Sequence, residues 1–156
     1  MYITMTKRWG PPTWLFLHTF STHIEPTFYE RNRAEILSLI TSLFNCLPCP
    51  ECTKHASIHA KSLTPHKVQT KEQFQKFLFD MHNSVNRRLH KSEFTHYSQY
   101  KRANFNLICK YFYDEMLRPT GGVAFLDASC RRTLIYKFIK FMNAHYSHFS
   151  HLNVSL

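Results

Sequence analysis

Glycine is scarce in this chain. Only 3 of its 156 residues are glycine and 7 are proline. β-Sandwiches and barrels with many tight hairpins depend on such residues and are excluded. A glycine-rich dinucleotide loop of the G-x-G-x-x-G type is excluded too, because Gly10, Gly121 and Gly122 cannot form one. With 44% hydrophobic residues, we expect one all-α domain with one core.

Long apolar segments are also missing. No uninterrupted apolar run approaches the ~20 residues that span a bilayer. The first residues carry Lys7 and Arg8 and contain no apolar segment typical of a secretory signal. We therefore expect no membrane span and a cytoplasmic location.

The net charge of +10 suits an anionic partner such as nucleic acid or a phosphate-bearing ligand. The lysines and arginines are dispersed, however, and form no block of five or six residues. We therefore do not expect nucleic-acid binding to be the main function.

Four helices are predicted in the first two thirds of the chain. Pro11 and Pro12 are expected to open the first helix, which ends before Pro26. Apolar residues recurring at helical spacing predict two others, over residues 28–44 and 71–90, and Pro50, suited to a first helical turn, predicts a short one over residues 50–63. These four helices are expected to form a bundle.

The last third of the chain has a weaker pattern. Apolar spacing predicts a helix over residues 105–116, then a loop over residues 118–122. A further helix is expected to start near Asp127 or Ser129 and to reach His145, and the tail from Ser147 is expected to be loose. The chain therefore adds a helical C-terminal extension to the bundle.

Two cysteines three residues apart stand at a predicted helix start. Pro50 suits the first turn of that helix, which places Cys49 and Cys52 where unpaired N–H groups and the helix dipole stabilise a thiolate. A redox-active disulfide is one interpretation. A zinc site with Cys46 and His55 as further ligands, or unreactive buried thiols, are the alternatives, although four ligands at uniform three-residue spacing cannot easily converge tetrahedrally.

Polar and aromatic residues flank this dithiol in the sequence. Trp14 and His18 share one helix face and could line a slot for a flat aromatic ligand, or simply form a core pair. His82 and Asn86 share a face of the fourth helix, near the cations Arg87, Arg88 and Lys91. This edge suits a nucleotide with its diphosphate near the cations, although a solvated helix end would look similar.

Three motifs together resemble the Erv/ALR family of FAD-linked sulfhydryl oxidases. They are Trp9-Gly10-x-x-x-Trp14-x-x-x-His18-Thr19, Leu47-Pro48-Cys49-x-x-Cys52 with His55, and His82-Asn83-x-Val85-Asn86-x-x-Leu89-x-Lys91. The resemblance covers roughly residues 7 to 103. The Leu-Pro-Cys-Pro-x-Cys phrase is most similar to the members encoded by large DNA viruses, which implies a host-cytoplasm or virion location.

The resemblance implies a four-helix bundle that holds FAD, with a short fifth helix and a homodimer. It implies an oxidase domain over residues 1–104, with the extension over residues 105–156 packed on the core or dimerising with it. The expected cofactor-binding residues are Gly10, Thr13, Trp14, His18, His55, His82, Asn83, Val85, Asn86, Lys91, Tyr100 and Lys101. No metal is expected.

The resemblance also implies the reaction. Thiols of a protein or of a shuttle dithiol are oxidised by the Cys49–Cys52 pair, which passes electrons to FAD and then to O2, giving H2O2. The helix position predicts Cys49 as the more exposed sulfur, and the resemblance implies that Cys52 faces the flavin. Such oxidases often use a second cysteine pair to relay electrons to the first. Cys109 and Cys130 are candidates for this pair. The alternatives are that these two cysteines form a structural disulfide or remain unpaired. The family's usual pair that staples the fifth helix is not evident, and Cys46 is an extra cysteine.

Overall fold

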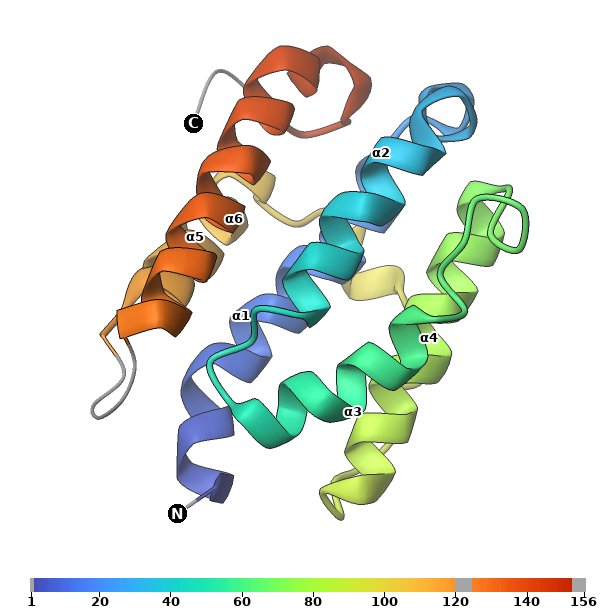
Figure 1. Ribbon diagram of the computed structural model, residues 1–156. Helices are drawn as coiled ribbons and strands as arrows, with labels where there is room; N and C mark the ends of the chain where they lie inside the picture. The colour runs from blue at the N-terminus through green and yellow to red at the C-terminus, as the bar shows by residue number, and fades with distance from the viewer. Residues whose placement is uncertain (1, 120–124, 153–156) are drawn as a thin grey trace.

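The computed structural model describes the backbone of residues 2–119 and 125–152 and is helical throughout (Figure 1). Its elements are α1 (Tyr2–His23), α2 (Pro26–Phe44), α3 (Pro50–Ala60), α4 (Lys71–Arg88), the 3-10 helix η1 (Ser98–Tyr100), α5 (Phe105–Leu117), α6 (Phe125–His145) and the 3-10 helix η2 (Tyr146–His148). Within these ranges the β-structure is limited to one bridge, between Ile24 and Phe149. The all-α prediction is confirmed.

The first helix starts earlier than predicted. Pro11 and Pro12 lie inside α1, which begins at Tyr2, so the prediction that they open the helix was wrong. Both prolines lack the N–H that a helix interior normally uses. The Thr13 hydroxyl donates to the Trp9 carbonyl at 2.7 Å and so supplies a hydrogen bond beside the interrupted turn.

Local sequence signals account for the other helix starts. Pro26 and Pro50 each occupy the first turn of their helix, where a missing N–H costs nothing. A capping box opens α4: Gln73 N–H donates to the Thr70 hydroxyl at 3.3 Å, and Thr70 N–H donates to Gln73 Oε1 at 3.2 Å. The helix predicted over residues 105–116 corresponds to α5, and the loop predicted over residues 118–122 extends beyond the described residues.

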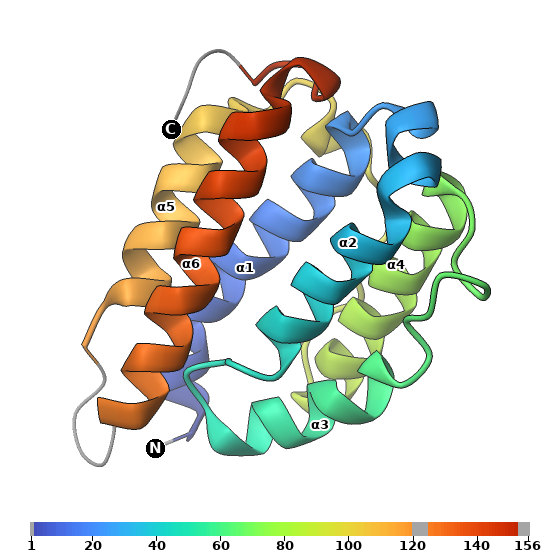
Figure 2. The same ribbon diagram turned by 45° about the horizontal axis from the view of Figure 1, so that its top comes forward.

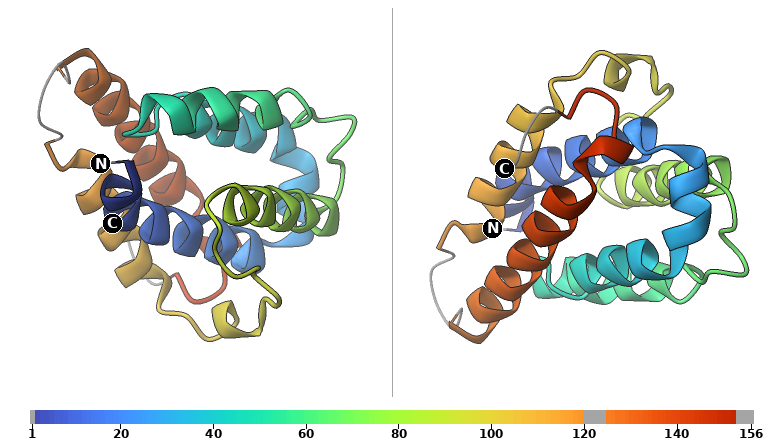
Figure 3. Two further views of the ribbon diagram at one scale, coloured as in Figure 1. Left: turned by 90° about the horizontal axis from the view of Figure 1, so that it is seen from below. Right: turned by 90° about the horizontal axis from the view of Figure 1, so that it is seen from above.

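Helices α1 to α4 form the bundle, and α5 and α6 pack against one side of it. In Figure 2, α3 lies across one end of α2 and α4, while α5 and α6 cover the side of α1 that faces away from α4. Both views in Figure 3 show α5 and α6 on one side of the molecule and α4 on the other. The contacts between elements agree, since α1 packs on α4 and on α5, while α2 packs on α3 and on α6. The C-terminal helices thus extend the core of the bundle.

Aromatic rings join the extension to the bundle. Phe16 of α1 stacks on Phe112 of α5 with ring centroids 4.3 Å apart, and meets Phe138 of α6 edge-on at 5.3 Å. All three side chains are fully buried. Burial of such rings contributes most of the packing energy of a core, so α5 and α6 belong to the same hydrophobic unit as α1.

The predicted loose tail is ordered over most of its length. The backbone of Ser150 donates to His23 O at 2.9 Å, and that of Glu25 donates to His148 O at 2.8 Å. Phe149 and Leu152 are buried in the core. Apolar burial and backbone pairing with the α1–α2 junction therefore hold residues 147–152, and residues 153–156 lie outside the described part of the chain. In residues 2–119 and 125–152, no helix is both long and apolar enough to cross a membrane.

Candidate active site

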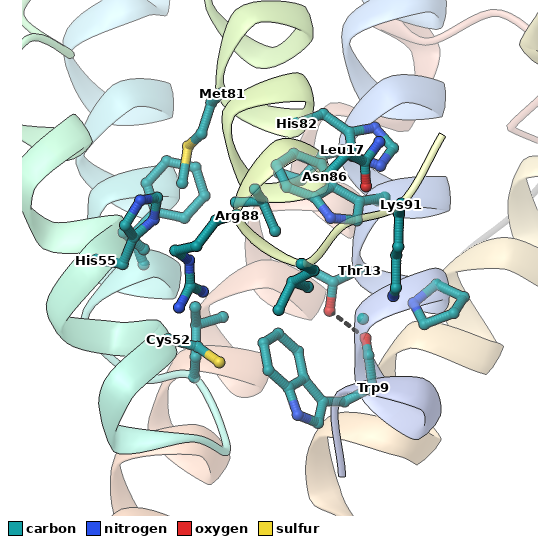
Figure 4. A pocket seen from close by; sticks show the side chains of 18 of the residues that line it. Trp9, Thr13, Leu17, Cys52, His55, Met81, His82, Asn86, Arg88 and Lys91 are labelled. Atoms are coloured by element: carbon teal, nitrogen blue, oxygen red, sulfur yellow. Dashed lines mark hydrogen bonds between the residues drawn. The ribbon is translucent and has the colours of Figure 1, made fainter. Parts of the chain in front are cut away.

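A cavity of about 450 Å³ opens between α1, α3 and α4 (Figure 4). Its size falls in the range typical of sites for small ligands and cofactors, roughly 300–1,000 Å³. Nine of the predicted cofactor-binding residues line it: Gly10, Thr13, Trp14, His55, His82, Val85, Asn86, Lys91 and Tyr100. The fold thus brings together residues that are far apart in the sequence, and Cys52 lies in the same wall.

The two cysteines of the predicted redox pair form a disulfide at the start of α3. Cys49 is the N-cap residue, and its Sγ accepts a hydrogen bond from Cys52 N–H at 3.2 Å. The Thr53 hydroxyl lies 3.1 Å from the Cys49 carbonyl and steadies the same turn. An N–H donor and a helix N-terminus both favour a thiolate on Cys49 once the disulfide is reduced.

The exposures of the two sulfurs are the reverse of the prediction. Cys49 is only 4% exposed, whereas Cys52 is half-buried and its side chain turns into the cavity (Figure 4). Cys49 was predicted to be the more exposed because it comes first in the helix. In the folded chain, however, surrounding residues bury Cys49. The sulfur next to the cavity is that of Cys52, as the resemblance implied.

A stack of aromatic rings forms the wall of the cavity opposite α3. Trp14 and His82 lie nearly parallel, with ring centroids 4.1 Å apart. His18 lies behind them, fully buried, and its Nε2 shares a hydrogen bond of 2.9 Å with His82 Nδ1. His18 therefore supports the wall through His82 and does not line the cavity itself.

Both histidines of this stack are held neutral. Burial lowers the pKa of His18 to about 3, with a further decrease from the neighbouring His82. Burial likewise lowers the pKa of His82 to about 4, helped by the positive charge of Lys91. Two neutral imidazoles can share a hydrogen bond in which one ring donates and the other accepts.

This pair predicts a loss of stability in acid. Below pH 6.5 His18 and His82 are protonated in the unfolded chain, whereas in the folded chain both stay neutral down to a lower pH. The free energy of unfolding therefore falls as the pH drops. We expect the cofactor-free protein to lose about 1–2 kcal/mol per histidine between pH 7 and pH 5. Guanidinium unfolding at the two pH values measures this, with His82→Gln as the control that shows a smaller loss. Equal stability of the wild type at both pH values would contradict it.

The two asparagines of α4 have different roles. Asn86 lines the cavity. Asn83 is buried and ties down the following loop, because its Nδ2 donates to Phe94 O at 2.9 Å and its Oδ1 accepts from Phe94 N–H at 2.7 Å. Asn83 was predicted to bind the nucleotide, but the structure places it behind the site as a positioning residue.

Positive charge gathers where α4 ends. Lys91 and Arg88 both line the cavity, and Figure 4 shows the Arg88 side chain extending toward Cys52 and His55. Burial lowers the pKa of His55, and the charge of Arg88 lowers it further. Arg88 was predicted as one of the cations near a nucleotide diphosphate, although it was not counted among the cofactor-binding residues. Lys101, which was predicted to bind the cofactor, is exposed just after η1 and does not line the cavity.

The cavity suits a flat aromatic ligand that carries anionic groups. Its walls offer stacked rings, an amide at Asn86 and two cations at the end of α4. His55 Nδ1 is buried and has no hydrogen-bond partner among the described residues, so a polar group of a ligand would satisfy it. These features fit the nucleotide and ring system predicted from the sequence.

The remaining cysteines rule out one of the alternatives left open by the sequence, a pair formed by Cys109 and Cys130. Cys130 forms a disulfide with Cys46, while Cys109 is a free thiol buried in the core. Burial raises the pKa of Cys109 to about 12, which makes it unreactive. A Cys109–Cys130 relay is therefore wrong, because α5 turns Cys109 inward. The zinc site considered as an alternative needs Cys46, Cys49 and Cys52 as thiolates, but all three form disulfides. The described residues contain no metal-binding cluster.

Comparisons with known proteins identify the family and several relatives of this chain. The model of the Erv1/Alr family matches residues 11–105. An FAD-linked sulfhydryl oxidase of African swine fever virus (isolate Tick/Malawi/Lil 20-1/1983) is 32% identical over 93 residues, which is 60% of this chain and 76% of that protein. The FAD-linked sulfhydryl oxidase ERV1 of Arabidopsis thaliana is 33% identical over 85 residues, 54% of this chain and 44% of that protein. No solved structure matches the chain significantly.

Proposed function

The chain belongs to the Erv1/Alr family, and we propose that it acts as an FAD-linked sulfhydryl oxidase with Cys49 and Cys52 as its redox-active pair. The observation that carries this proposal is the disulfide at the start of α3, whose Cys52 lies in the wall of a cavity that fits a flavin nucleotide. The overall reaction is 2 R-SH + O2 giving R-S-S-R + H2O2. The substrates are thiols, and oxygen is the electron acceptor.

Residues on three helices would hold the cofactor. We assign the ring system to the space beside Cys52 and Arg88, bounded by Trp14 and His55, and the anionic diphosphate to the part of the cavity lined by Asn86 and Lys91. Bound FAD supplies a two-electron acceptor that takes electrons from the reduced cysteine pair and delivers them to O2.

The chain itself controls the thiol chemistry. When the disulfide opens, the N–H of Cys52 and the first turn of α3 stabilise a thiolate on Cys49. Cys52 meanwhile faces the cavity, where the positive charge of Arg88 favours its thiolate form. The neutral His18–His82 pair holds the opposite wall in position.

We propose that residues 1–104 carry the oxidase unit and that residues 105–156 are a helical addition which completes its core. We also propose a homodimer, as the resemblance implies. Light scattering should give twice the mass of one chain. The similarity to viral relatives favours action in the host cytoplasm or the virion.

The proposed cofactor site predicts the effect of removing its stacked ring. Trp14→Ala is expected to weaken FAD binding about 10- to 100-fold, because the variant loses the aromatic wall that Trp14 forms with His82. Flavin absorbance of the purified protein and titration of the cofactor-free protein measure the change. Tyr136→Ala, which removes an exposed ring from α6, is the matched control and should stay yellow. A colourless wild-type protein that consumes no oxygen with a dithiol would refute the proposed function.

A further inference from the structure

The C-terminal tail contacts a buried histidine at the end of α1. His23 is the last residue of α1, and its backbone carbonyl accepts a hydrogen bond from the N–H of Ser150 at 2.9 Å. Its ring contacts the same residue, since His23 Nδ1 lies 2.7 Å from Ser150 Oγ. Ser150 lies beyond residues 11–105, which match the family model. His23 therefore joins the family unit to the added segment, and it belongs to none of the three sequence motifs.

The other nitrogen of the His23 ring reaches the cofactor site. His23 Nε2 lies 2.7 Å from the carbonyl oxygen of Tyr100, and Tyr100 lines the FAD cavity. Tyr100 is buried, and its ring stacks on that of His18 with centroids 5.2 Å apart. His18 in turn holds His82 in the aromatic wall. A series of direct contacts thus runs from the tail through His23 to the wall of the cavity.

The two partners of His23 define where its ring carries hydrogen. A backbone carbonyl only accepts, so Nε2 donates to Tyr100 O. In a neutral imidazole the other nitrogen is then an acceptor, and the Ser150 hydroxyl donates to Nδ1. Burial lowers the pKa of His23, the hydrogen bond to Tyr100 partly opposes this, and His151 and Lys71 lower the pKa further, so the ring is neutral at pH 7. Ser150 and Tyr100 together hold the ring in one tautomer and one orientation.

The turn that carries Tyr100 is short and depends on anchors outside itself. It is η1, a single 3-10 turn between α4 and α5, and such turns have weak internal hydrogen bonds. The Tyr97 hydroxyl donates to Gln75 O and fixes the start of the turn to α4. At its end, Ala103 N–H donates to Tyr100 O at 3.2 Å, the long end of the usual range. The shorter bond from His23 fixes that end to α1.

We propose that His23 is a positioning residue for the cofactor site, which holds Tyr100 in the cavity wall and makes the affinity for FAD depend on the docked C-terminal tail. The proposal rests on the proposed function and adds a support for its cofactor that lies outside the sequence motifs. His23 acts through Tyr100 and does not line the cavity itself. A wall that is held in place before FAD arrives loses less conformational freedom on binding, which raises the affinity.

The first test replaces either end of the imidazole separately. The side-chain amide of glutamine reaches about as far as Nε2, and that of asparagine about as far as Nδ1. His23→Gln therefore keeps a donor for Tyr100 O, whereas His23→Asn keeps only the contact to Ser150. We expect the Kd for FAD to rise at least about fivefold in His23→Asn and less than about twofold in His23→Gln.

Equilibrium dialysis of the full-length holoenzyme, with released flavin measured by fluorescence, gives both Kd values. Equal affinity of His23→Asn and His23→Gln would overturn the proposal, because a side chain that only fills space would not distinguish them. A wild type that binds no flavin would instead refute the proposed function.

Hydrogen exchange of the full-length chain after removal of flavin provides a readout that does not depend on the cofactor. The N–H groups of Tyr100, Lys101 and Ala103 donate within or beside η1, so their exchange reports the order of the turn. Their protection should fall at least about threefold in His23→Asn and stay near the wild-type level in His23→Gln. Unchanged protection in His23→Asn would overturn the positioning role, whether or not the chain is an oxidase.

A double-mutant cycle tests the part played by the tail. Ser150→Ala removes the hydroxyl that orients the ring but keeps the backbone bond to His23 O. It should raise the Kd for FAD about threefold on its own and have no further effect together with His23→Gln, because glutamine has no group at the position of Nδ1. A full Ser150→Ala effect in the His23→Gln background would overturn the path through His23. Glu25→Gln is the control: it breaks a different tail contact, the exposed ion pair with His148, and should change the Kd less than about twofold.

Discussion

Cys52→Ser is expected to lower thiol oxidation at least about 10³-fold while the protein keeps its bound FAD. Cys52 lies in the cavity wall and forms the redox-active disulfide with Cys49. Serine has nearly the same size, so the cavity keeps its shape, but an oxygen cannot form the disulfide that accepts electrons from a thiol. The loss should therefore appear in the rate and not in the flavin content.

Oxygen uptake with dithiothreitol, together with the visible spectrum of the same sample, measures this result. Cys109→Ser is the matched control, because it makes the same substitution at a free buried cysteine on α5. We expect that control to keep at least about half of the wild-type rate. A Cys52→Ser enzyme that still oxidises thiols at the wild-type rate would show that the redox pair lies elsewhere.

Phe112→Ala is expected to lower the free energy of unfolding by about 3–5 kcal/mol. Phe112 is fully buried and stacks on Phe16 of α1 with a centroid distance of 4.3 Å. Its removal leaves a cavity between α5 and α1, which are extensively packed. Because α1 also supplies Trp14 to the cofactor cavity, flavin should dissociate from the variant at a lower temperature.

Thermal and guanidinium unfolding of the holoenzyme measure this loss. Leu107→Ala is the control on the same helix, since Leu107 is 63% exposed and its replacement should change stability by less than about 0.5 kcal/mol. A Phe112→Ala variant with wild-type stability and normal flavin content would contradict this prediction. It would mean that α1 to α4 fold and bind flavin without the packing of α5.

The sequence predicted the helices and much of the site because both follow from local patterns. Apolar residues at helical spacing marked the stripes of α2 and α4, and Pro50 marked the start of α3 beneath the dithiol. Residues four apart, such as His82 and Asn86, were correctly placed on one face that lines the cavity. Local geometry alone determines relations of this kind.

Several features depend on contacts between distant segments and could not be predicted. The pairing of Cys46 with Cys130 requires α6 to lie against the α2–α3 loop. The burial of Cys49 depends on the fold around the start of α3, which a helix position alone does not define. The order of the tail likewise comes from Phe149 packing into a core made by other helices.

The sequence by itself determined the chemistry of this protein: a dithiol at a helix start, with rings and cations at helical spacing that suit a flavin nucleotide. Only the tertiary structure decided which sulfur faces which side. Packing of α3 across the bundle turns Cys52 toward the FAD cavity and buries Cys49, and packing of α6 brings Cys130 to Cys46 on the opposite face. The reason is physical, because spacing along a chain defines the face of a helix, whereas burial depends on what the rest of the chain packs against that face.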